Sequence, residues 1–174
     1  MRPAAAIAGT SVFLIAPATV AGFVPWYISR WHSAWTTRLA IPIKIAGALL
    51  ILAAAAVIVE SFARFAIKGL GTPSPALPTH YLVVSGLYRF VRNPMYIAVA
   101  SIILGQAFIF GSLALLAYAT LVCAAFHLFV MTYEEPKLRT KFGSAYTEYC
   151  AEVPRWIPRT SPWMGDSSAH AAGS

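Results

Sequence analysis

One run of 41 residues, 93–133, contains no aspartate, glutamate, lysine or arginine. As a single helix it would measure about 60 Å, twice the ~30 Å hydrocarbon core of a bilayer. A turn signal, Phe110-Gly111-Ser112, lies near its midpoint. The run therefore predicts two membrane-spanning helices joined by a tight turn as a helical hairpin.

Two earlier segments are also apolar enough to span a bilayer. Residues 3–29 carry no charge and contain Pro17 and Pro25. A membrane helix tolerates such prolines by kinking where neighbouring helices supply partners for the freed carbonyls. The second segment, residues 41–65, has an uncharged centre at 45–59 and charges only near its ends, where they can reach the headgroups. Together with the hairpin, these segments predict four crossings.

The composition supports a membrane protein with one domain. Apolar residues make up 59% of the chain and charged residues 11%, against roughly 45–50% and about 25% in soluble domains. We expect an all-α integral membrane protein with about four transmembrane helices in a single domain, residues 1–164. Phe142, Tyr146 and Tyr149 recur at helical intervals, which predicts a C-terminal amphipathic helix that lies on the bilayer or caps the core. The small, polar tail 165–174 is predicted to be disordered.

The distribution of charge predicts the orientation. Four crossings place ten of the 13 basic residues on one side of the membrane. Because lysine and arginine near membrane ends favour the cytoplasm, we expect both termini and the active site to be cytoplasmic, in the inner or plasma membrane if the source is bacterial. Membrane orientation and attraction to anionic lipid then explain the net charge of +7 better than nucleic-acid binding does, and we expect no nucleic-acid partner. Aromatic residues beside the opposite end of the first helix are typical of an interfacial belt: Trp26, Tyr27, Trp31 and Trp35.

The first 25 residues have a competing interpretation as a cleaved signal peptide, because Arg2 precedes an apolar run that ends in small residues. That run is longer than a usual signal core. Its removal would leave three crossings and would place the two polar motifs on the side of the membrane that the distribution of basic residues disfavours. The cysteines are distant in sequence, with Cys123 in a predicted membrane helix and Cys150 in the predicted cytoplasmic tail. We therefore expect neither a disulfide nor a metal site.

Polar motifs flank the charge-free run on both sides. Before it, glycines and prolines within residues 69–78 exclude a regular helix, and the amides of such a loop can bind a carboxylate where they line a cavity. Asn93 and Pro94 suit the N-cap and first turn of the next helix, and capping alone is the alternative interpretation of that pair. After the run come Glu134 and Glu135, at the same membrane surface. The two motifs can therefore meet in one site.

Spacing suggests how side chains at the second motif are oriented. His127 and Glu134 are seven residues apart, two turns along one face of a regular helix, so both could point into one cavity. Packing against a neighbouring helix is an equally weighted alternative for a lone histidine in a membrane helix. Glu134 and Glu135 are offset by about 100°, so at most one of them faces the site squarely.

The order of these motifs resembles that of the integral-membrane methyltransferases, the group of isoprenylcysteine carboxyl methyltransferases and phosphatidylethanolamine N-methyltransferases. The resemblance covers roughly residues 78–158, whereas the two N-terminal helices resemble the family only in being hydrophobic. It rests on two patterns, His80-x-Leu-Val-x-x-Gly86-x-Tyr88…Arg92-Asn93-Pro94-x-Tyr96 and Glu134-Glu135-x-x-Leu138-x-x-x-Phe142-Gly143-x-x-Tyr146-x-x-Tyr149…Val153-Pro154-Arg155.

The resemblance implies an S-adenosylmethionine site in residues 78–158 and methyl transfer to a lipophilic or amphiphilic acceptor within the membrane. Glu134 is implied to hold the charged methionine portion of the cofactor, since a carboxylate pairs with its ammonium. The residues implied to bind the cofactor are His80, Tyr81, Leu82, Val83, Gly86, Tyr88, Asn93, Pro94, Met95, Tyr96 and Glu134. The candidate catalytic residues are Arg92 and Glu135, from their nearness to the site, and His127, from its spacing.

Two positions depart from the family pattern. Asn93 stands where the family usually has histidine, and asparagine cannot carry a proton. Val130 replaces an arginine that isoprenylcysteine enzymes associate with the substrate carboxylate. The acceptor therefore need not be a prenylcysteine, and phospholipid (ethanolamine) N-methylation is an alternative. A membrane reductase that uses a nicotinamide cofactor, or a non-enzymatic membrane scaffold, is a rival from a different class. A scaffold has no need for His80 and Glu134 together, and the related sterol reductases are longer chains.

Overall fold

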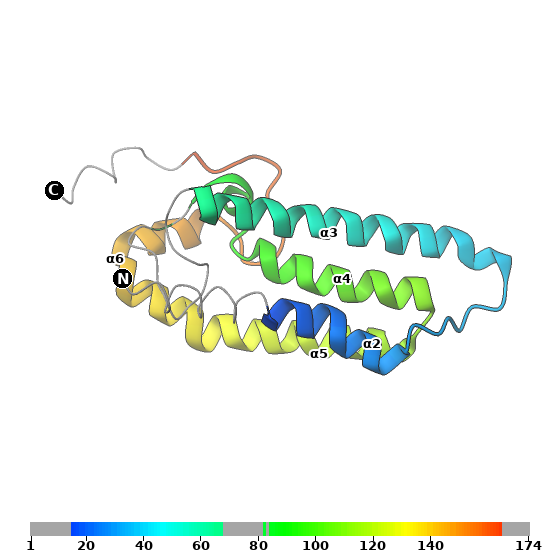
Figure 1. Cartoon of the computed structure of the whole chain (residues 1–174). Helices are drawn as coiled ribbons and strands as arrows, with labels where there is room; N and C mark the ends of the chain where they lie inside the picture. Colours follow the sequence, from blue (N-terminus) through cyan, green and yellow to red (C-terminus); the bar gives the residue numbers. More distant parts are fainter. Residues whose placement is uncertain (1–14, 68–81, 83, 165–174) are drawn as a thin grey trace.

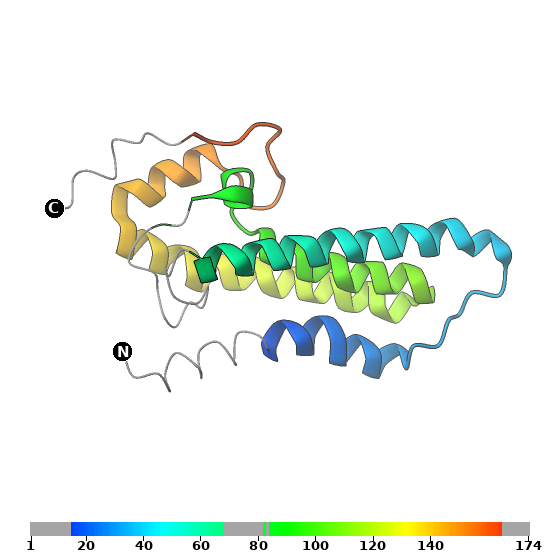
Figure 2. The ribbon, with the colours of Figure 1, turned by 45° about the horizontal axis from the view of Figure 1, so that its top comes forward.

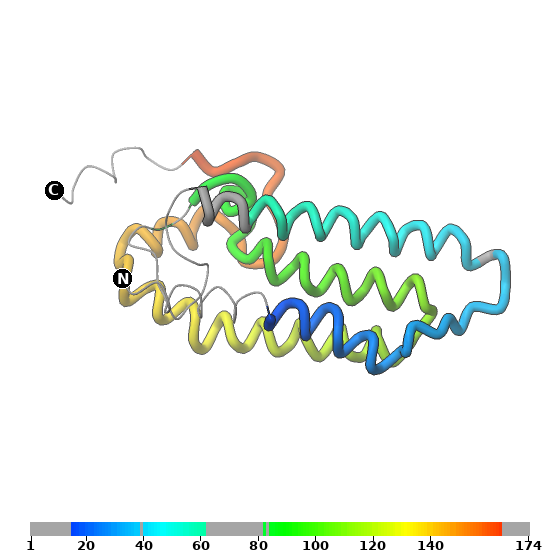
Figure 3. Tube along the Cα trace, viewed as in Figure 1, coloured from blue at the N-terminus to red at the C-terminus, as the bar shows by residue number. Residues whose placement is uncertain are grey.

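The computed structural model describes residues 15–67, 82 and 84–164, and in this part the chain forms a bundle of four helical segments (Figures 1 and 3). The first segment, Ile15–Ser29, contains the π-helical turn η1 (Thr19–Phe23) and the short helix α2 (Val24–Ser29). The other three segments are α3 (Ile41–Ile67), α4 (Pro94–Phe110) and α5 (Leu113–Phe129). The predicted start of the first helix, most of the glycine- and proline-rich loop and the predicted disordered tail lie outside the described residues.

Two of the described helices have the length and apolarity that a membrane crossing requires, and two others are apolar but shorter. Ile41–Ser61 and Leu113–Glu152 are long enough and apolar enough to cross a bilayer, and Ile15–Ser29 and Pro94–Phe110 are shorter apolar helices. A helix of 17 residues such as α4 measures about 26 Å at 1.5 Å per residue. The prediction of an all-α membrane protein is confirmed.

The predicted hairpin of α4 and α5 is present. Gly111 ends α4 in the left-handed conformation (φ 64°), which glycine adopts without a steric penalty. Ser112 then caps α5, because its side-chain oxygen accepts a hydrogen bond from the Leu115 amide (3.3 Å). Both residues satisfy backbone groups at a helix end, and this explains why the turn lies at the sequence signal.

Pro25 distorts the first segment, and neighbouring helices satisfy the freed carbonyls, as the sequence predicts. Pro25 has no amide hydrogen, and the preceding π-turn shifts the register, so the carbonyls of Val20 and Ala21 lose intrahelical donors. The Tyr118 hydroxyl of α5 donates to the Val20 oxygen (3.1 Å), and the Gln106 side chain of α4 donates to the Ala21 oxygen (2.7 Å).

Glycines set the closest approach of α3 to α4. A Cβ atom added at Gly105 would lie 2.7 Å from the Gly47 oxygen and 2.6 Å from Ile51 Cγ1. Small residues allow such a crossing in membranes, where van der Waals packing drives helix association. On its other side α4 contributes Val99 and Ile103 to the core, which also includes Ala21 of the first segment.

The bundle end where α2 leads into α3 is held by loop residues. The Trp35 indole donates to the Phe108 carbonyl (2.9 Å) and the Ala34 amide to the Phe110 carbonyl (2.8 Å), so two orphan carbonyls at the end of α4 have partners. The short 3-10 helix η2 (Arg38–Ala40) then leads into α3. The Arg30 guanidinium lies over the Trp26 and Tyr27 rings of the predicted aromatic belt, 4.9 and 4.7 Å from their centroids.

The opposite end carries the polar motifs. The 3-10 turn η3 (Gly86–Arg89) precedes α4, and the π-turn η4 (Val130–Glu134) connects α5 to α6 (Glu135–Glu152). Gly143 bends α6 (φ 53°, ψ −126°), and its second half folds back across the bundle end (Figure 2). Tyr146, Tyr149 and Val153 are buried there. The predicted C-terminal helix therefore exists, and its aromatic face caps the core.

Candidate active site

The chain after α6, residues 153–164, runs back along the segment that leads into α4, and we call it the strap. The amides of the segment before α4 are not in a regular helix, so they and the neighbouring carbonyls require other partners. The strap provides these partners in three backbone hydrogen bonds. The Arg92 amide donates to the Pro154 oxygen of the strap (3.0 Å). The strap amides of Arg159 and Trp163 donate to the oxygens of Phe90 (2.9 Å) and Arg89 (3.0 Å).

A buried ion-pair cluster, Arg92, Glu135 and Arg155, joins the strap to α6 and to the start of α4. Arg155 Nε and Nη2 donate to the two Glu135 oxygens at 2.6 and 3.0 Å, and Arg92 Nη1 donates to Oε1 at 3.1 Å. Only 8% of the Glu135 side chain is exposed. The hydrogen bond to Glu135 raises the pKa of the Arg155 guanidinium above its usual range. Two of the predicted catalytic residues, Arg92 and Glu135, thus pair with each other.

Glu134 faces a different set of groups, which we call the tyrosine–glutamate cluster: Tyr88, Tyr96 and Glu134. The Tyr96 hydroxyl donates to Glu134 Oε2 at 2.8 Å. Burial first, and then the negative charges of Glu134 and Glu60, raise the pKa of the Tyr88 phenol above its usual range, while the nearby Ser61 hydroxyl acts in the opposite direction. The cluster therefore gathers residues from η3, α4 and η4 at one end of the bundle, and Glu60 and Ser61 of α3 act on its Tyr88 phenol.

The predicted common face of His127 and Glu134 is not observed, and the reason is the π-turn η4. A π-turn inserts one extra residue into the helix, so positions eight apart, not seven, share a face across it. Tyr96 accordingly contacts Phe126 (ring centroids 4.8 Å apart) as well as Glu134. His127 is exposed, and its Nδ1 accepts a hydrogen bond from the Trp156 indole of the strap (3.0 Å).

Asn93 occupies the N-cap position of α4, with Pro94 in the first turn, as predicted. The Asn93 side chain does not cap the helix, however, and this part of the prediction is wrong. Its Nδ2 donates to the Arg155 carbonyl of the strap at 3.2 Å. The strap therefore determines the role of this side chain, through a contact 62 positions away in sequence.

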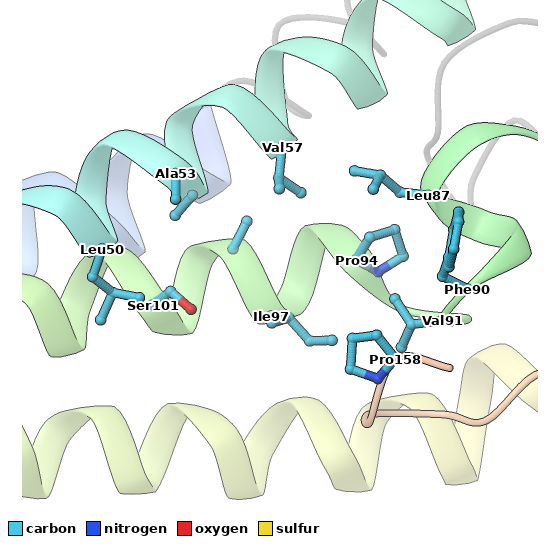
Figure 4. A pocket seen from close by; sticks show the side chains of 12 residues that line it. Leu50, Ala53, Val57, Leu87, Phe90, Val91, Pro94, Ile97, Ser101 and Pro158 are labelled. Carbon is cyan, nitrogen blue, oxygen red and sulfur yellow. The ribbon is translucent and has the colours of Figure 1, made fainter. Parts of the chain in front are cut away.

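An apolar groove opens between α3 and α4 beside this end of the bundle (Figure 4). Its volume is about 380 Å³. The two helices cross closely at Gly47 and Gly105 and diverge towards η3, and small residues such as Ala53 and Ser101 leave the space between them unfilled. Leu87, Phe90 and Pro158 border the groove at η3 and the strap.

The structure brings together part of the predicted site. Leu82 packs against the buried aromatics of α6, Gly86 begins η3 in the left-handed conformation (φ 58°), and Met95 is half-buried. His80, Tyr81 and Val83 lie outside the described residues. Sequence reasoning missed two elements of the site, the strap residue Arg155 as partner of Glu135 and the Glu60-Ser61 pair of α3. Glu60 could have been found from the sequence, because an ionisable residue near the end of a membrane helix is a candidate for a functional site.

The tyrosine–glutamate cluster has the chemistry of a cation-binding site. A half-buried carboxylate held by a phenol can pair with an ammonium group, and tyrosine faces attract a sulfonium or ammonium ion. Four of the described arginines at this end have other partners. Arg92 and Arg155 bind Glu135, Arg89 donates to the Trp163 carbonyl (2.6 Å), and Arg159 pairs with Glu152 (3.6 Å).

Comparison with known proteins identifies one family and two relatives. Residues 43–145, more than half of the chain, match the family described as phospholipid methyltransferase. Over 79 residues, 45% of this chain and 34% of the relative, the sequence is 34% identical to the protein-S-isoprenylcysteine O-methyltransferase of Schizosaccharomyces pombe. Over 140 residues, 80% of this chain and 59% of the relative, it is 28% identical to the cobalt-zinc-cadmium resistance protein CzcN of Cupriavidus metallidurans. The alignments thus span about one third and three fifths of these relatives.

Proposed function

Because this chain belongs to the phospholipid methyltransferase family, we propose that it transfers a methyl group from S-adenosylmethionine to a lipophilic or amphiphilic acceptor in the membrane. The observation that carries the proposal is the hydrogen bond of Tyr96 to Glu134 at the end of an apolar bundle. The half-buried Glu134 carboxylate is suited to the ammonium of the donor's methionine portion. The name of the isoprenylcysteine relative supports methyl transfer as the reaction type.

The donor pocket that we propose extends from the tyrosine–glutamate cluster along the chain before α4. Tyr88 and Tyr96 supply aromatic surface near Glu134. Pro94 and Met95 supply apolar surface, which suits adenine. The positions assigned through the family pattern complete the pocket: His80, Tyr81, Leu82, Val83, Gly86 and Asn93.

The protein's part in the reaction is alignment and exclusion of water. A sulfonium donor is already a strong methylating agent, so the rate depends mainly on holding donor and acceptor in line. Glu134 and Tyr96 orient the donor, and the strap and α6 cover the polar end of the bundle, where Tyr149 donates to the Tyr88 carbonyl (2.7 Å). Arg92 and Glu135 act by holding the strap in place.

Three other functions remain as alternatives. N-methylation of an ethanolamine phospholipid is supported by Val130, which offers no cation for a carboxylate substrate. A membrane reductase would bind a nicotinamide cofactor, and a scaffold would bind neither that cofactor nor the methyl donor. Measuring the binding of both cofactors to the purified protein therefore separates a methyltransferase from the reductase and the scaffold, whereas the two kinds of methyl transfer are separated by the acceptor that is methylated.

We place the candidate site on the cytoplasmic side of the membrane. The basic residues of η3, α6 and the strap lie at one end of the bundle, whereas Arg30, Arg38 and Lys44 lie at the opposite end (Figure 1). Since basic residues near membrane ends favour the cytoplasm, the donor enters from that side. The acceptor enters from the bilayer.

The substitution Glu134→Gln tests the donor site. It removes the charge but retains an acceptor for Tyr96, so we expect an intact bundle and a loss of donor affinity of at least about tenfold. The measurement is calorimetric binding of S-adenosylmethionine and S-adenosylhomocysteine to the protein in detergent. Glu148→Gln, at an exposed position of α6, is the matched control. Equal affinities of Glu134→Gln and wild type would refute the assignment.

A further inference from the structure

The tip of the strap, residues 156–158, lies beside the membrane-spanning helices. The Trp156 indole donates to His127, which belongs to α5 (3.0 Å). Pro158 borders the groove near Ile97, which lies one turn inside α4 (Figure 4). The chain therefore leaves the polar end of the bundle after α6 and returns to the level of the helices.

The first turn of α4 lies at the depth of the lipid chains. At 1.5 Å per residue, the 17 residues of α4 measure about 26 Å, about 4 Å less than the hydrocarbon core of a bilayer. The far end of α4 lies at the membrane surface, because the Trp35 indole binds the Phe108 carbonyl there and tryptophan favours the interface. Pro94 is then about 4 Å inside the boundary on the polar side, and Ile97 is about 9 Å inside it.

The side chains of the tip are apolar and open to the surroundings. Ile157 is 79% exposed, and Leu128, the α5 residue that follows His127, is 61% exposed. Exposed side chains at this depth are surrounded by lipid, and isoleucine and leucine insert favourably there. Trp156 suits the same place, because its ring is apolar and its indole N–H already has an acceptor.

The charges beside the tip are directed away from the lipid. Arg155 and Arg159 flank the three tip residues in the sequence. Arg155 pairs with Glu135 (2.6 Å) and Arg159 with Glu152 (3.6 Å), and both carboxylates belong to α6. Long basic side chains near a membrane boundary extend towards the polar side in this way. The strap thus has an apolar tip between two charged positions.

Backbone groups on both sides of the tip have partners within the protein. The Arg155 carbonyl accepts from the Asn93 side chain (3.2 Å). The Arg159 amide donates to the Phe90 carbonyl (2.9 Å), and Pro158 has no amide hydrogen to satisfy. Non-helical backbone is tolerated at membrane depth where the protein supplies such partners.

We propose that the strap is a re-entrant segment whose tip, Trp156-Ile157-Pro158, inserts into the lipid leaflet on the polar side of the bundle. Ile157 contacts the outer part of the lipid chains, and lipid holds the strap over the polar end together with the ion pairs of Glu135. The inference is independent of the proposed reaction, and its tests require neither donor nor acceptor.

Spin labelling in nanodiscs of zwitterionic lipid tests the depth of the tip. The label is attached to Ile157→Cys in a background of Cys123→Ala and Cys150→Ser. The controls are Leu121→Cys, exposed in the middle of α5, and Ser144→Cys, exposed in α6. Oxygen concentrates in lipid chains, whereas a nickel chelate stays in water.

We expect an oxygen-to-nickel collision ratio for Ile157→Cys that is several-fold above that of Ser144→Cys and approaches that of Leu121→Cys. A ratio equal to that of Ser144→Cys would place the tip in water and overturn the proposal. Low collision rates with both reagents would show that protein covers the tip, and this result would overturn it as well.

A charge at the tip gives an independent test in the same nanodiscs. Ile157→Asp should lower the thermal unfolding midpoint by about 5 °C, because a carboxylate is costly at this depth. In water the same carboxylate would lie between two arginines and would leave the midpoint unchanged or higher. Ser144→Asp, the matched control, should not change the midpoint. An unchanged or raised midpoint in Ile157→Asp would contradict insertion.

Discussion

Glu134 and Glu135 are adjacent in the chain, yet their carboxylates have different surroundings. Glu134 accepts from a tyrosine hydroxyl, whereas Glu135 binds two arginines. Adjacent positions on a helix differ by about 100°, so one side chain faces the bundle end and the other faces the strap. The first arrangement leaves a carboxylate for a cationic ligand, and the second neutralises its charge within the protein.

Removing the Glu135 charge should destabilise the fold. Glu135→Gln would leave Arg92, which is 11% exposed, and Arg155 without a counter-charge. We expect a loss of about 3 kcal/mol in the free energy of unfolding, as for other buried pairs deprived of one partner. The measurement is the thermal unfolding midpoint in detergent.

The exposed pair of Glu152 and Arg159 is the internal control. The Glu152 side chain is 52% exposed, so Glu152→Gln should change the free energy of unfolding by less than about 1 kcal/mol. Similar shifts in the midpoints of the two variants would show that the Glu135 cluster has no special structural role.

His127 is not placed to act as a proton acceptor at Nδ1. The Trp156 indole can only donate, so its hydrogen bond fixes the proton of neutral His127 on Nε2. His127→Asn retains an acceptor near Nδ1, and we expect its methyl-transfer rate to stay within about threefold of wild type, whereas loss of a general base costs at least about 100-fold. A pH–rate profile of the variant checks this expectation. A 100-fold loss would return His127 to the list of catalytic residues.

At the scale of elements, the π-turns and the glycine crossing determine which residues meet. The π-turn η1 accompanies Pro25 and directs two carbonyls to α4 and α5. The π-turn η4 brings Phe126 and Glu134 to the same tyrosine. The crossing at Gly47 and Gly105 holds α3 and α4 together at one point and lets the groove open beyond it.

Gly105→Ala should disturb this crossing. The new Cβ would lie 2.6 Å from Ile51 Cγ1 and 2.7 Å from a backbone oxygen, so the helices must separate. We expect a loss of about 1–3 kcal/mol in the free energy of unfolding, measured as a lower thermal midpoint. Gly22→Ala is the matched control, since a Cβ there meets nothing within 4 Å and alanine favours the helix. A midpoint for Gly105→Ala equal to that of the control would show that the crossing is loose.

At the scale of the whole molecule, the proposed orientation can be measured with single cysteines in a background of Cys123→Ala and Cys150→Ser. Thr36 is exposed in the loop before α3, and Ser144 is exposed in α6 at the opposite end. With the proposed orientation, a membrane-impermeant maleimide should label Thr36→Cys in intact cells and Ser144→Cys only after lysis. The reverse pattern would place the candidate site on the outer side of the membrane.

The sequence by itself determined the membrane class, the hairpin turn and the starts of α3 and α4. Each depends on local properties, namely the hydropathy of a continuous run, the conformational freedom of Gly111 and the missing amide of Pro94. The family pattern also indicated that Tyr88, Tyr96 and Glu134 belong to one site, and the structure brings these three together.

The tertiary structure decided the register across η4, the partners of Glu135 and the groove. These features depend on contacts between distant segments. Arg92 and Glu135 are 43 positions apart, and Asn93 and Arg155 are 62 apart. A one-residue insertion in a helix leaves no mark in hydropathy, yet it moves His127 away from the face that it was predicted to share with Glu134. The groove likewise arises from the angle between two helices, which packing determines and local sequence does not.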